Sequence, residues 1–470
     1  MKKFYTASDV EYAASRGESS IAINEYDVIT DVAREAAEKH NIEFVIGNKL
    51  TEMADNRPGE STMPNTGRPI SSAVDGRIIA PEYRGLISDQ EVETWRREFP
   101  ILKDAIHVAN CSQSAQANRV RGAINRYLDN WLTVGMDWEA WMEEVYFAKA
   151  EFAKLINADP SEIAIASSVS ETLSSVASFL DYSKGRQKIV ATDAEFPTVN
   201  YVWLAHQKYG AKVDFIAVND RHEIELSEYE RYIDENTLMT SITQVYYLNG
   251  FKQDIAEIAE IAHSKGSLVL ADVYQGIGTE PIDVKKMNID ILTTGNLKYL
   301  FGLPGVAFMY VNKDLVPMLK PAVTGWFGQD NPFLFQSRYL DWAADASRFD
   351  TGTPPVLNAY AARAGLEIVN EVGVDRIKDR VDMLSAHALQ GCLDRGLKTI
   401  SPFDVNKKGA TTAIWVSDKI DSGEMETELR KRDIIASARG DVIRVAPHFY
   451  TTTQEIDHVL DQIKQILDGK

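Results

Sequence analysis

Short apolar runs alternate with amphipathic segments along the chain from about residue 95 onward. The apolar runs predict strands at 188–191, 213–217, 244–247, 267–271, 291–293 and 306–310. Helical patterns lie between several of them, as at 255–265, where apolar residues stand at 255, 258, 261 and 262. Strands that are apolar along their whole length and separated by helices indicate an α/β fold with a mainly parallel sheet covered on both faces. Ligands of such sheets bind at the loops that follow the carboxyl ends of the strands.

The two ends of the chain have different patterns. At the N-terminus we expect helices at 6–16 and 28–40 and strands at 20–23 and 43–46, which predicts a small accessory unit at 1–60. The stretch 56–69 is rich in turn-forming residues, so 61–95 is interpreted as a linker and the start of the next domain. A large domain at 96–345 is then followed by helix, strands and a last helix at 453–467, a small α+β domain at 346–470. The sequence shows no internal repeat.

Composition and charge narrow the class of protein. Of the 470 residues, 44% are apolar and 25% charged, the balance of a soluble globular chain. A net charge of −19 argues against nucleic acid as a partner, because neutralising phosphates needs clustered Lys and Arg. With no membrane-spanning run and no signal peptide at the start, we expect a cytoplasmic protein without a membrane partner. Cys111 and Cys392 are too few for a disulfide framework, and the eight His residues give no support for a metal site.

An acid and a lysine follow two of the predicted strands. Asp272 ends one buried strand, and Lys298 comes 26 positions later in 293-TTGNLKYLFGLPG-305. Pyridoxal-5′-phosphate (PLP) chemistry needs both groups: a lysine amine to hold the aldehyde and a carboxylate to keep the pyridine nitrogen protonated. Gln275 is placed to donate to the phenolic oxygen of the cofactor, and Asn296 is a further candidate cofactor-binding residue. Taken alone, an Asp at a strand end is usually a turn residue and a Lys is usually solvated.

Two upstream segments fit the same cofactor. Ser168 and Glu171 form a capping-box pattern at a strand-to-helix junction. The backbone N–H groups near Ser170 and Glu171 would then face an anion, which suits the cofactor phosphate, although an ordinary capped helix has the same pattern. Phe196 follows another strand and is expected to stack on the cofactor ring, although a lone Phe is more often part of a core.

Taken together, these segments resemble the class V aminotransferase superfamily of PLP enzymes of fold type I, which includes kynureninase, cysteine desulfurase and isopenicillin N epimerase. The resemblance covers about 95–470. It implies a PLP-binding large domain with a seven-stranded type of sheet and a small C-terminal domain. It also implies that Asp272 is the pyridine-nitrogen acid, Gln275 the phenolate partner and Lys298 the Schiff-base lysine.

Several local matches refine the resemblance. The segments 298–305 and 324–328 are similar to those of kynureninase, whose Trp, here Trp326, is lent to the neighbouring subunit's phosphate site. Gln275 instead stands where kynureninase has a His, as in cysteine desulfurases. Thr353 lies in a Gly-Thr loop thought to reach across a dimer, so the resemblance implies a homodimer. Arg444 matches the carboxylate-binding arginine of the superfamily, and Asn110 and Ser114 match a segment that lines the substrate pocket.

The sequence indicates a PLP enzyme that acts on an amino acid but does not decide which reaction it catalyses. We expect a small-molecule amino-acid substrate and a lyase or hydrolase that cleaves at the β-carbon (C–S or C–C), with an aminotransferase or epimerase as the alternative. A desulfurase acting through a persulfide needs a Cys around 320–350, where none stands, and Cys392 is interpreted as a core residue. A non-catalytic relative would be expected to lose the Schiff-base lysine or the pyridine acid, and both are present.

Overall fold

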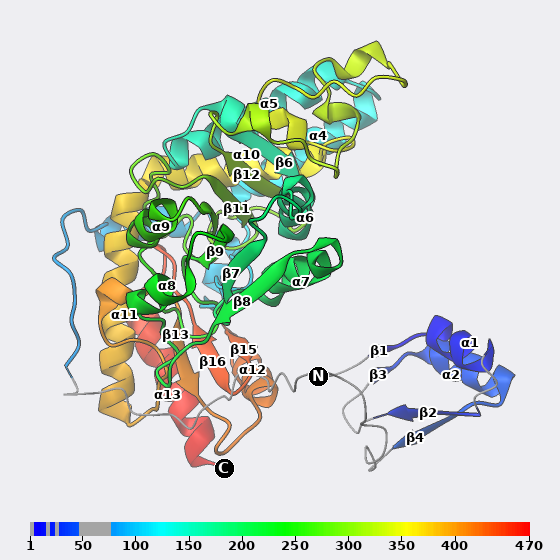
Figure 1. Cartoon of the computed structure of the whole chain (residues 1–470). Helices are drawn as coiled ribbons and strands as arrows, with labels where there is room; N and C mark the ends of the chain where they lie inside the picture. The colour runs from blue at the N-terminus through cyan, green and yellow to red at the C-terminus, as the bar shows by residue number, and fades with distance from the viewer. Residues whose placement is uncertain (1–3, 16–18, 24–27, 47–76) are drawn as a thin grey trace. The chain divides into compact units, whose positions relative to one another are not determined.

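The computed structural model describes residues 4–15, 19–23, 28–46 and 77–470. The chain divides into two compact units, Met1–Asn65 and Thr66–Lys470 (Figure 1). The predicted linker at 56–69 lies outside the described residues. The part of the chain that is described contains no helix long and apolar enough to cross a membrane.

The N-terminal unit consists of two β–α–β halves, a repeat of structure that the sequence did not reveal. The first half is β1 (Phe4–Tyr5), α1 (Ala7–Ser15) and β2 (Ser20–Ile23), and the second is β3 (Val28–Ile29), α2 (Asp31–His40) and β4 (Glu43–Ile46). β1 pairs with β3 and β2 with β4, both in parallel. The predicted helix at 28–40 was too long, because Val28 and Ile29 form the short strand β3 and Thr30 caps α2 by accepting from the Ala33 N–H.

The second unit is built on a seven-stranded sheet in the order β6-β12-β11-β10-β9-β7-β8, in which β12 alone runs opposite to the other strands. The strands are β6 (Ile163–Ala166), β7 (Lys188–Thr192), β8 (Lys212–Ile216), β9 (Thr237–Thr243), β10 (Leu268–Asp272), β11 (Ile291–Gly295) and β12 (Ala307–Val311). The predicted α/β fold with a mainly parallel sheet is confirmed.

One predicted strand was wrong. Residues 244–247 lie in the loop after β9 and not in the sheet. They are apolar because Val245 and Tyr246 are buried beneath neighbouring loops, with Val245 in an isolated bridge to Lys252. The true strand, Thr237–Thr243, carries Thr and Ser at four of its seven positions and was less apparent as an apolar run.

Helices cover both faces of this sheet. Alternate residues along each strand face opposite sides. Leu270 and Ile291 pack with residues of α6 (Val169–Phe179) and α7 (Pro197–Ala205). The next residues, Ala271 and Leu292, belong to the core formed with α4, α5 and α10. The helices on that side and beyond are α4 (Asn118–Thr133), α5 (Trp138–Leu155), α8 (Leu226–Tyr232), α9 (Ile255–Ser264) and α10 (Val356–Val372).

The C-terminal part has its own small sheet and core. Its strands, in the antiparallel order β13-β16-β15, are β13 (Thr412–Trp415), β15 (Ser437–Arg439) and β16 (Val442–Val445). They pack with α11 (Val374–Arg395), α12 (Ser422–Arg430) and α13 (Thr453–Asp468). A two-stranded sheet, β14 (Ile434–Ile435) with β5 (Ile106–His107), joins this part to the segment before α4.

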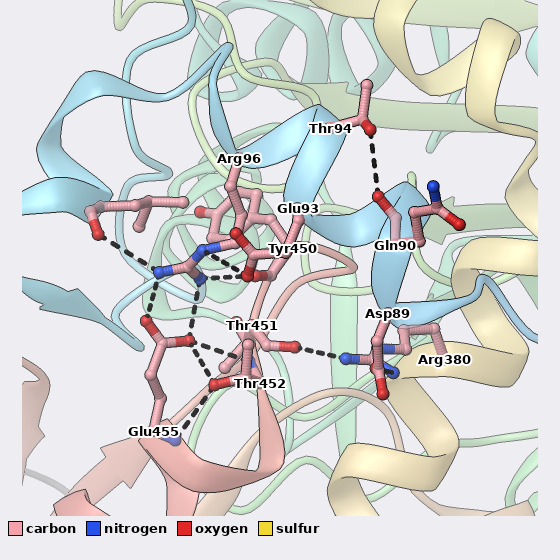
Figure 2. Close-up of polar contacts among 11 residues, drawn as sticks. Asp89, Gln90, Glu93, Thr94, Arg96, Arg380, Tyr450, Thr451, Thr452 and Glu455 are labelled. Atoms are coloured by element: carbon pink, nitrogen blue, oxygen red, sulfur yellow. Dashed lines mark hydrogen bonds and ion pairs between the residues drawn. The ribbon is translucent and has the colours of Figure 1, made fainter.

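Ion pairs hold the turn that follows β16 (Figure 2). Arg96 in α3 (Asp89–Arg96) donates to both carboxyl oxygens of Glu455, at 2.8 and 3.0 Å, and to the carbonyl of Tyr450 at 2.8 Å. Glu455 also completes the capping box of Thr452 at the start of α13. Arg380 of α11 donates to the carbonyl of Thr451 at 3.0 Å. These buried, charge-assisted bonds fix the backbone just beyond the strand that carries Arg444.

Candidate active site

The carboxyl ends of β9, β10 and β11 open into a cavity of about 400 Å³. Because these strands are parallel neighbours, their last residues and the loops beyond them meet at one edge of the sheet. Six of the predicted site residues line this cavity: Ser170, Phe196, Asp272, Gln275, Lys298 and Arg444. They come from five separate segments of the chain, since Asp272 and Gln275 share one, and the sheet brings these segments together.

Asp272 and Lys298 form the charged centre of the cavity. Burial raises the pKa of Asp272, while a hydrogen bond from the Tyr274 N–H (2.9 Å to Oδ1) and the charge of Lys298 oppose that rise. Burial lowers the pKa of Lys298 to about 8, and the carboxylate of Asp272 opposes this shift. The lysine head is enclosed by protein but open to the cavity, so a neutral amine is available there near neutral pH.

A second acid lies behind Asp272 and was missed by the sequence analysis. Glu195 is 2% exposed, and its pKa is raised well above the ordinary range by burial and by the negative charge of Asp272. Of the two carboxyl groups, Glu195 is therefore the one that keeps its proton, since Asp272 has a lysine partner and Glu195 has none. The charged carboxylate of the cavity is then Asp272.

Two aromatic rings enclose the amine of Lys298. Its Nζ lies 4.0 Å from the ring centroid of Tyr274 and 5.8 Å from that of Phe196. The Tyr274 ring occupies the space where a Cβ at Gly295 would lie, only 2.1 Å from the phenol atoms. Phe196 is 43% exposed and also meets Tyr247 edge-on at 5.3 Å. Both rings therefore lie close to the amine.

The N-termini of α6 and α7 converge on another wall of the cavity. Ser168 caps α6 by accepting from the Glu171 N–H at 3.2 Å. The predicted capping box is only half formed, because the Glu171 side chain bonds Ser167, at its N–H and hydroxyl, and the Thr351 hydroxyl instead of the Ser168 N–H. Ser170 Oγ lies 3.5 Å from Thr198 Oγ1 of α7, which also lines the cavity. Free N–H groups and two hydroxyls thus meet at a helix N-terminus.

Arg444 is a buried guanidinium without a carboxylate partner. It is 1% exposed and donates to the carbonyl of Tyr247 at 2.8 Å, to Ser112 Oγ at 3.0 Å and to Ser437 Oγ at 2.7 Å. Its Nε has no acceptor among the described residues. Because all three acceptors are neutral, the positive charge of Arg444 is left for a ligand in the cavity.

Three predicted residues lie beneath the cavity and not in its lining. Asn110 donates to the carbonyl of Ala446 at 2.8 Å and accepts from the Tyr450 hydroxyl at 2.6 Å, so it supports the segment after Arg444. Ser114 is buried, and its N–H donates to Leu297 just before the lysine. Asn296 is fully buried against Gly302, where any Cβ would overlap its Oδ1.

The remaining predicted residues also lie outside this chain's cavity. Glu171 bonds Ser167 and Thr351, and these hydrogen bonds outweigh burial and lower its pKa. Trp326 stacks on Phe335 with ring centroids 6.0 Å apart, and Thr353 is exposed. The expectation that Trp326 and Thr353 serve a neighbouring subunit stays a prediction.

Several lining residues were given no role from the sequence, among them Cys111, Thr198, Tyr247, Tyr274 and Arg439. Tyr274 stands between Asp272 and Gln275, and Thr198 stands two residues after Phe196, so proximity to those candidates was the available signal. Cys111 directly follows the candidate Asn110, so the same signal was available there. Tyr247 and Arg439 are not adjacent to a predicted candidate, and no local pattern marks them. Cys392, in contrast, is fully buried in α11, where burial raises its pKa to about 12.

A lysine of lowered pKa, a buried carboxylate and a helix N-terminus at the carboxyl edge of this sheet define the class of PLP enzymes of fold type I. The chain belongs to the aminotransferase class-V family, whose model matches residues 118–459. Enzymes of this family are PLP-dependent.

The relatives support this family and differ in their names. YcbU of Bacillus subtilis (strain 168), named an uncharacterized aminotransferase, is 42% identical over 79% of this chain and 97% of its own length. A kynureninase of Geobacillus thermodenitrificans is 25% identical over 82% of this chain and 94% of its own. The apo structure of a cysteine desulfurase from Thermococcus onnurineus, 20% identical, covers 80% of this chain and 98% of that one with a TM-score of 0.73. That last similarity is one of fold.

The residues of the cavity fit the cofactor of this family. Gln275 Nε2 donates to the carbonyl of Cys111 at 3.1 Å, which leaves its second hydrogen for another acceptor, and its Oε1 has no partner among the described residues. Ser168 and Ser170 offer donors to a phosphate, and Asp272 and Lys298 supply the acid and the amine. PLP carries a phosphate for the serines, a pyridine nitrogen for Asp272, an aldehyde for Lys298 and a phenolic oxygen for Gln275.

Proposed function

We propose that this protein holds PLP as a Schiff base on Lys298 and cleaves a bond at the β-carbon of an amino acid, as a lyase or hydrolase. The observation that carries the proposal is the meeting of Lys298 and Asp272 in one cavity. When bound, PLP supplies an electron sink for the pair of electrons left at the α-carbon. The residues of this chain then have to bind the substrate, orient it and move its protons.

Lys298 is the group proposed to move the α-proton. Its lowered pKa, about 8, matches the requirement that a general base have a pKa near the working pH. Asp272 is proposed to pair with the protonated ring nitrogen of PLP. This nitrogen would be a second positive group near the buried carboxylate, besides Lys298. Ser168, Ser170 and Thr198 are proposed to hold the phosphate, and Phe196 to lie against the ring.

Arg444 is proposed to bind the α-carboxylate of the substrate. Its hydrogen-bonding partners are two hydroxyls and one carbonyl, so the guanidinium is positioned without being neutralised. A carboxylate would supply the negative charge that this site lacks, through charge-assisted hydrogen bonds. Asn110 is proposed to support the site indirectly, because its hydrogen bonds hold Ala446 and Tyr450 in place.

Cleavage at the β-carbon is favoured over transamination by the proton donors in the cavity. A departing group at the β-carbon is helped by a proton donor besides Lys298, whereas in transamination Lys298 alone could return the proton that it removes. Burial raises the pKa of both Tyr247 and Tyr274, so their phenols stay protonated and able to donate. A kynureninase is among the relatives, in line with the resemblance of 298–305 to its lysine loop.

An aminotransferase is the second candidate, because the relative at 42% identity, YcbU, bears that name. The two candidates leave different products. Purified protein supplied with PLP is incubated with a panel of amino acids, and ammonia, 2-oxo acids and sulfur products are assayed. Turnover without an added 2-oxo acid supports the lyase or hydrolase, and a stable pyridoxamine form that a 2-oxo acid reverses supports the aminotransferase. The Lys298→Ala variant is the control and is expected to be inactive in either case.

We also propose a homodimer in which Trp326 and Thr353 complete the neighbour's cavity. Both residues lie outside the cavity of their own chain. Large apolar side chains near Trp326 are exposed, among them Phe335 at 73% and Tyr339 at 76%. Light scattering tests the assembly, and mixing Lys298→Ala with Trp326→Ala subunits tests the sharing. Regained activity in the mixture supports shared sites, and a monomer with full activity contradicts them.

A further inference from the structure

Two arginines lie on the same face of the β15–β16 hairpin. The turn between the strands is Gly440 and Asp441, with Gly440 at a φ of 53°, which a glycine adopts without strain. This turn pairs Arg439 with Val442 and Ser437 with Arg444. Paired residues and those two positions further along point to one side of a sheet, so Arg439 is the diagonal neighbour of Arg444. Both side chains line the cavity.

The two guanidiniums differ in their partners. Arg444 has three neutral acceptors from the protein. Arg439 is exposed, and its guanidinium forms no hydrogen bond or ion pair with any residue that the structure describes. The acid near it, Glu426, already accepts from the Ala438 N–H at 2.8 Å and lies 3.8 Å from Arg430. All the donors of Arg439 therefore remain free.

Positive charge is in excess on this side of the cavity. Lys298, Arg439 and Arg444 line it, with Asp272 as the one carboxylate among the described lining residues. Besides burial, both arginines lower the pKa of Lys298, and Arg444 lowers that of Arg439. Arg439 and Arg444 keep their charge when Lys298 is neutral or joined to PLP, and two like charges in a concave site attract a ligand with more than one negative group.

We propose that Arg439 binds a second carboxylate of the substrate, so that the preferred substrates are amino acids with an acidic side chain. The inference rests on the proposed function, in which Arg444 takes the α-carboxylate. Diagonal positions on neighbouring strands are about 7–8 Å apart. That spacing lets two long arginine side chains reach the two ends of one short dicarboxylic ligand. Arg439 is then a specificity residue and not part of the proton-transfer machinery.

The test uses dicarboxylates without an amine. They can bind to Arg439 and Arg444 together, and because they have no amino group they cannot replace the lysine on PLP. Succinate and glutarate are compared with butyrate and valerate by titration calorimetry on the PLP-supplied protein in phosphate-free buffer. We expect the dicarboxylate to bind at least about tenfold more tightly than the monocarboxylate of equal length. In Arg439→Gln this preference is lost while monocarboxylate affinity is unchanged. Arg432→Gln, a change at a surface arginine, keeps the preference.

Equal affinities in the wild type, or a preference that survives in Arg439→Gln, overturn the role of Arg439. A visible absorption spectrum of the same samples separates this failure from that of the proposed function. A PLP band without dicarboxylate preference leaves the proposed function standing and rejects the acidic substrate. No PLP band rejects the proposed function and this inference with it.

Discussion

The Nζ atom of Lys298 lies 4.0 Å from the ring centroid of Tyr274, and the ring fits there because residue 295 is a glycine. A Cβ at that position would lie 2.1 Å from the phenol. The position of the Tyr274 ring beside the amine therefore requires that residue 295, in the neighbouring strand β11, has no side chain.

Gly295→Ala is the first prediction that follows. The added methyl group forces the Tyr274 ring out of its place, and overpacking of this kind costs about 1–3 kcal/mol of unfolding free energy. We expect a lower midpoint in chemical denaturation and weaker retention of PLP. Gly122→Ala, in α4 with nothing within 4 Å of its added Cβ, is the matched control and should be neutral or stabilising. Equal behaviour of the two variants would contradict the packing argument.

The second prediction concerns pH. The pKa of Lys298, lowered to about 8, means that the neutral amine becomes the major form as pH rises through 8, well below the value of about 10.4 for a free lysine. The rate at which apoenzyme captures PLP should rise over that range. In Asp272→Asn the attraction that favours the ammonium is lost, so the midpoint should move to lower pH. A midpoint near 10 would show that the amine is not perturbed.

Arg444→Met should weaken amino-acid binding roughly 10- to 100-fold, the expected effect of losing hydrogen bonds to a charged group. Substrate affinity is read from the spectral change of the PLP-bound protein, and a denaturation curve checks that the fold survives. Arg432→Met, at the surface, should leave the affinity unaltered. Unchanged affinity in Arg444→Met would remove this residue from the site.

Cys111→Ser tests whether the one cysteine that lines the cavity takes part in the reaction. The proposed cleavage requires no thiol, so we expect turnover within about twofold of the wild type, a change too small to remove a catalytic step. Release of sulfide or other products is measured for both proteins. Loss of turnover in this variant would instead indicate a sulfur-transfer mechanism.

The sequence predicted the sheet and the pair Asp272 and Lys298 because Asp272 ends one short apolar run and Lys298 follows another. The misplaced strand at 244–247 has a different cause: Val245 and Tyr246 are buried by loop packing, which gives the same apolar signature as a strand. The capping box failed because the Glu171 carboxylate accepts from Ser167, four residues earlier, and from Thr351, which is remote in the chain.

Other parts of the site depend on contacts between distant segments. Arg439 reaches the cavity only because the turn at Gly440 sets the register of the hairpin. Asn110 matched the lining segment of relatives, but here its amide is held by Tyr450 and Ala446. Local pattern identifies which residues are polar at a strand end, and tertiary register decides which of them face the cavity.

The most direct test of the account is to find the lysine that carries PLP. The PLP-supplied protein is reduced with borohydride, digested, and its peptides are mapped by mass spectrometry. We expect the pyridoxyl group on Lys298, with loss of the label in Lys298→Ala. Lys408 is the alternative lysine for the label, because burial lowers its pKa to about 7. It lies outside the cavity lining. A label on Lys408 or another lysine, or no label at all, would contradict the account.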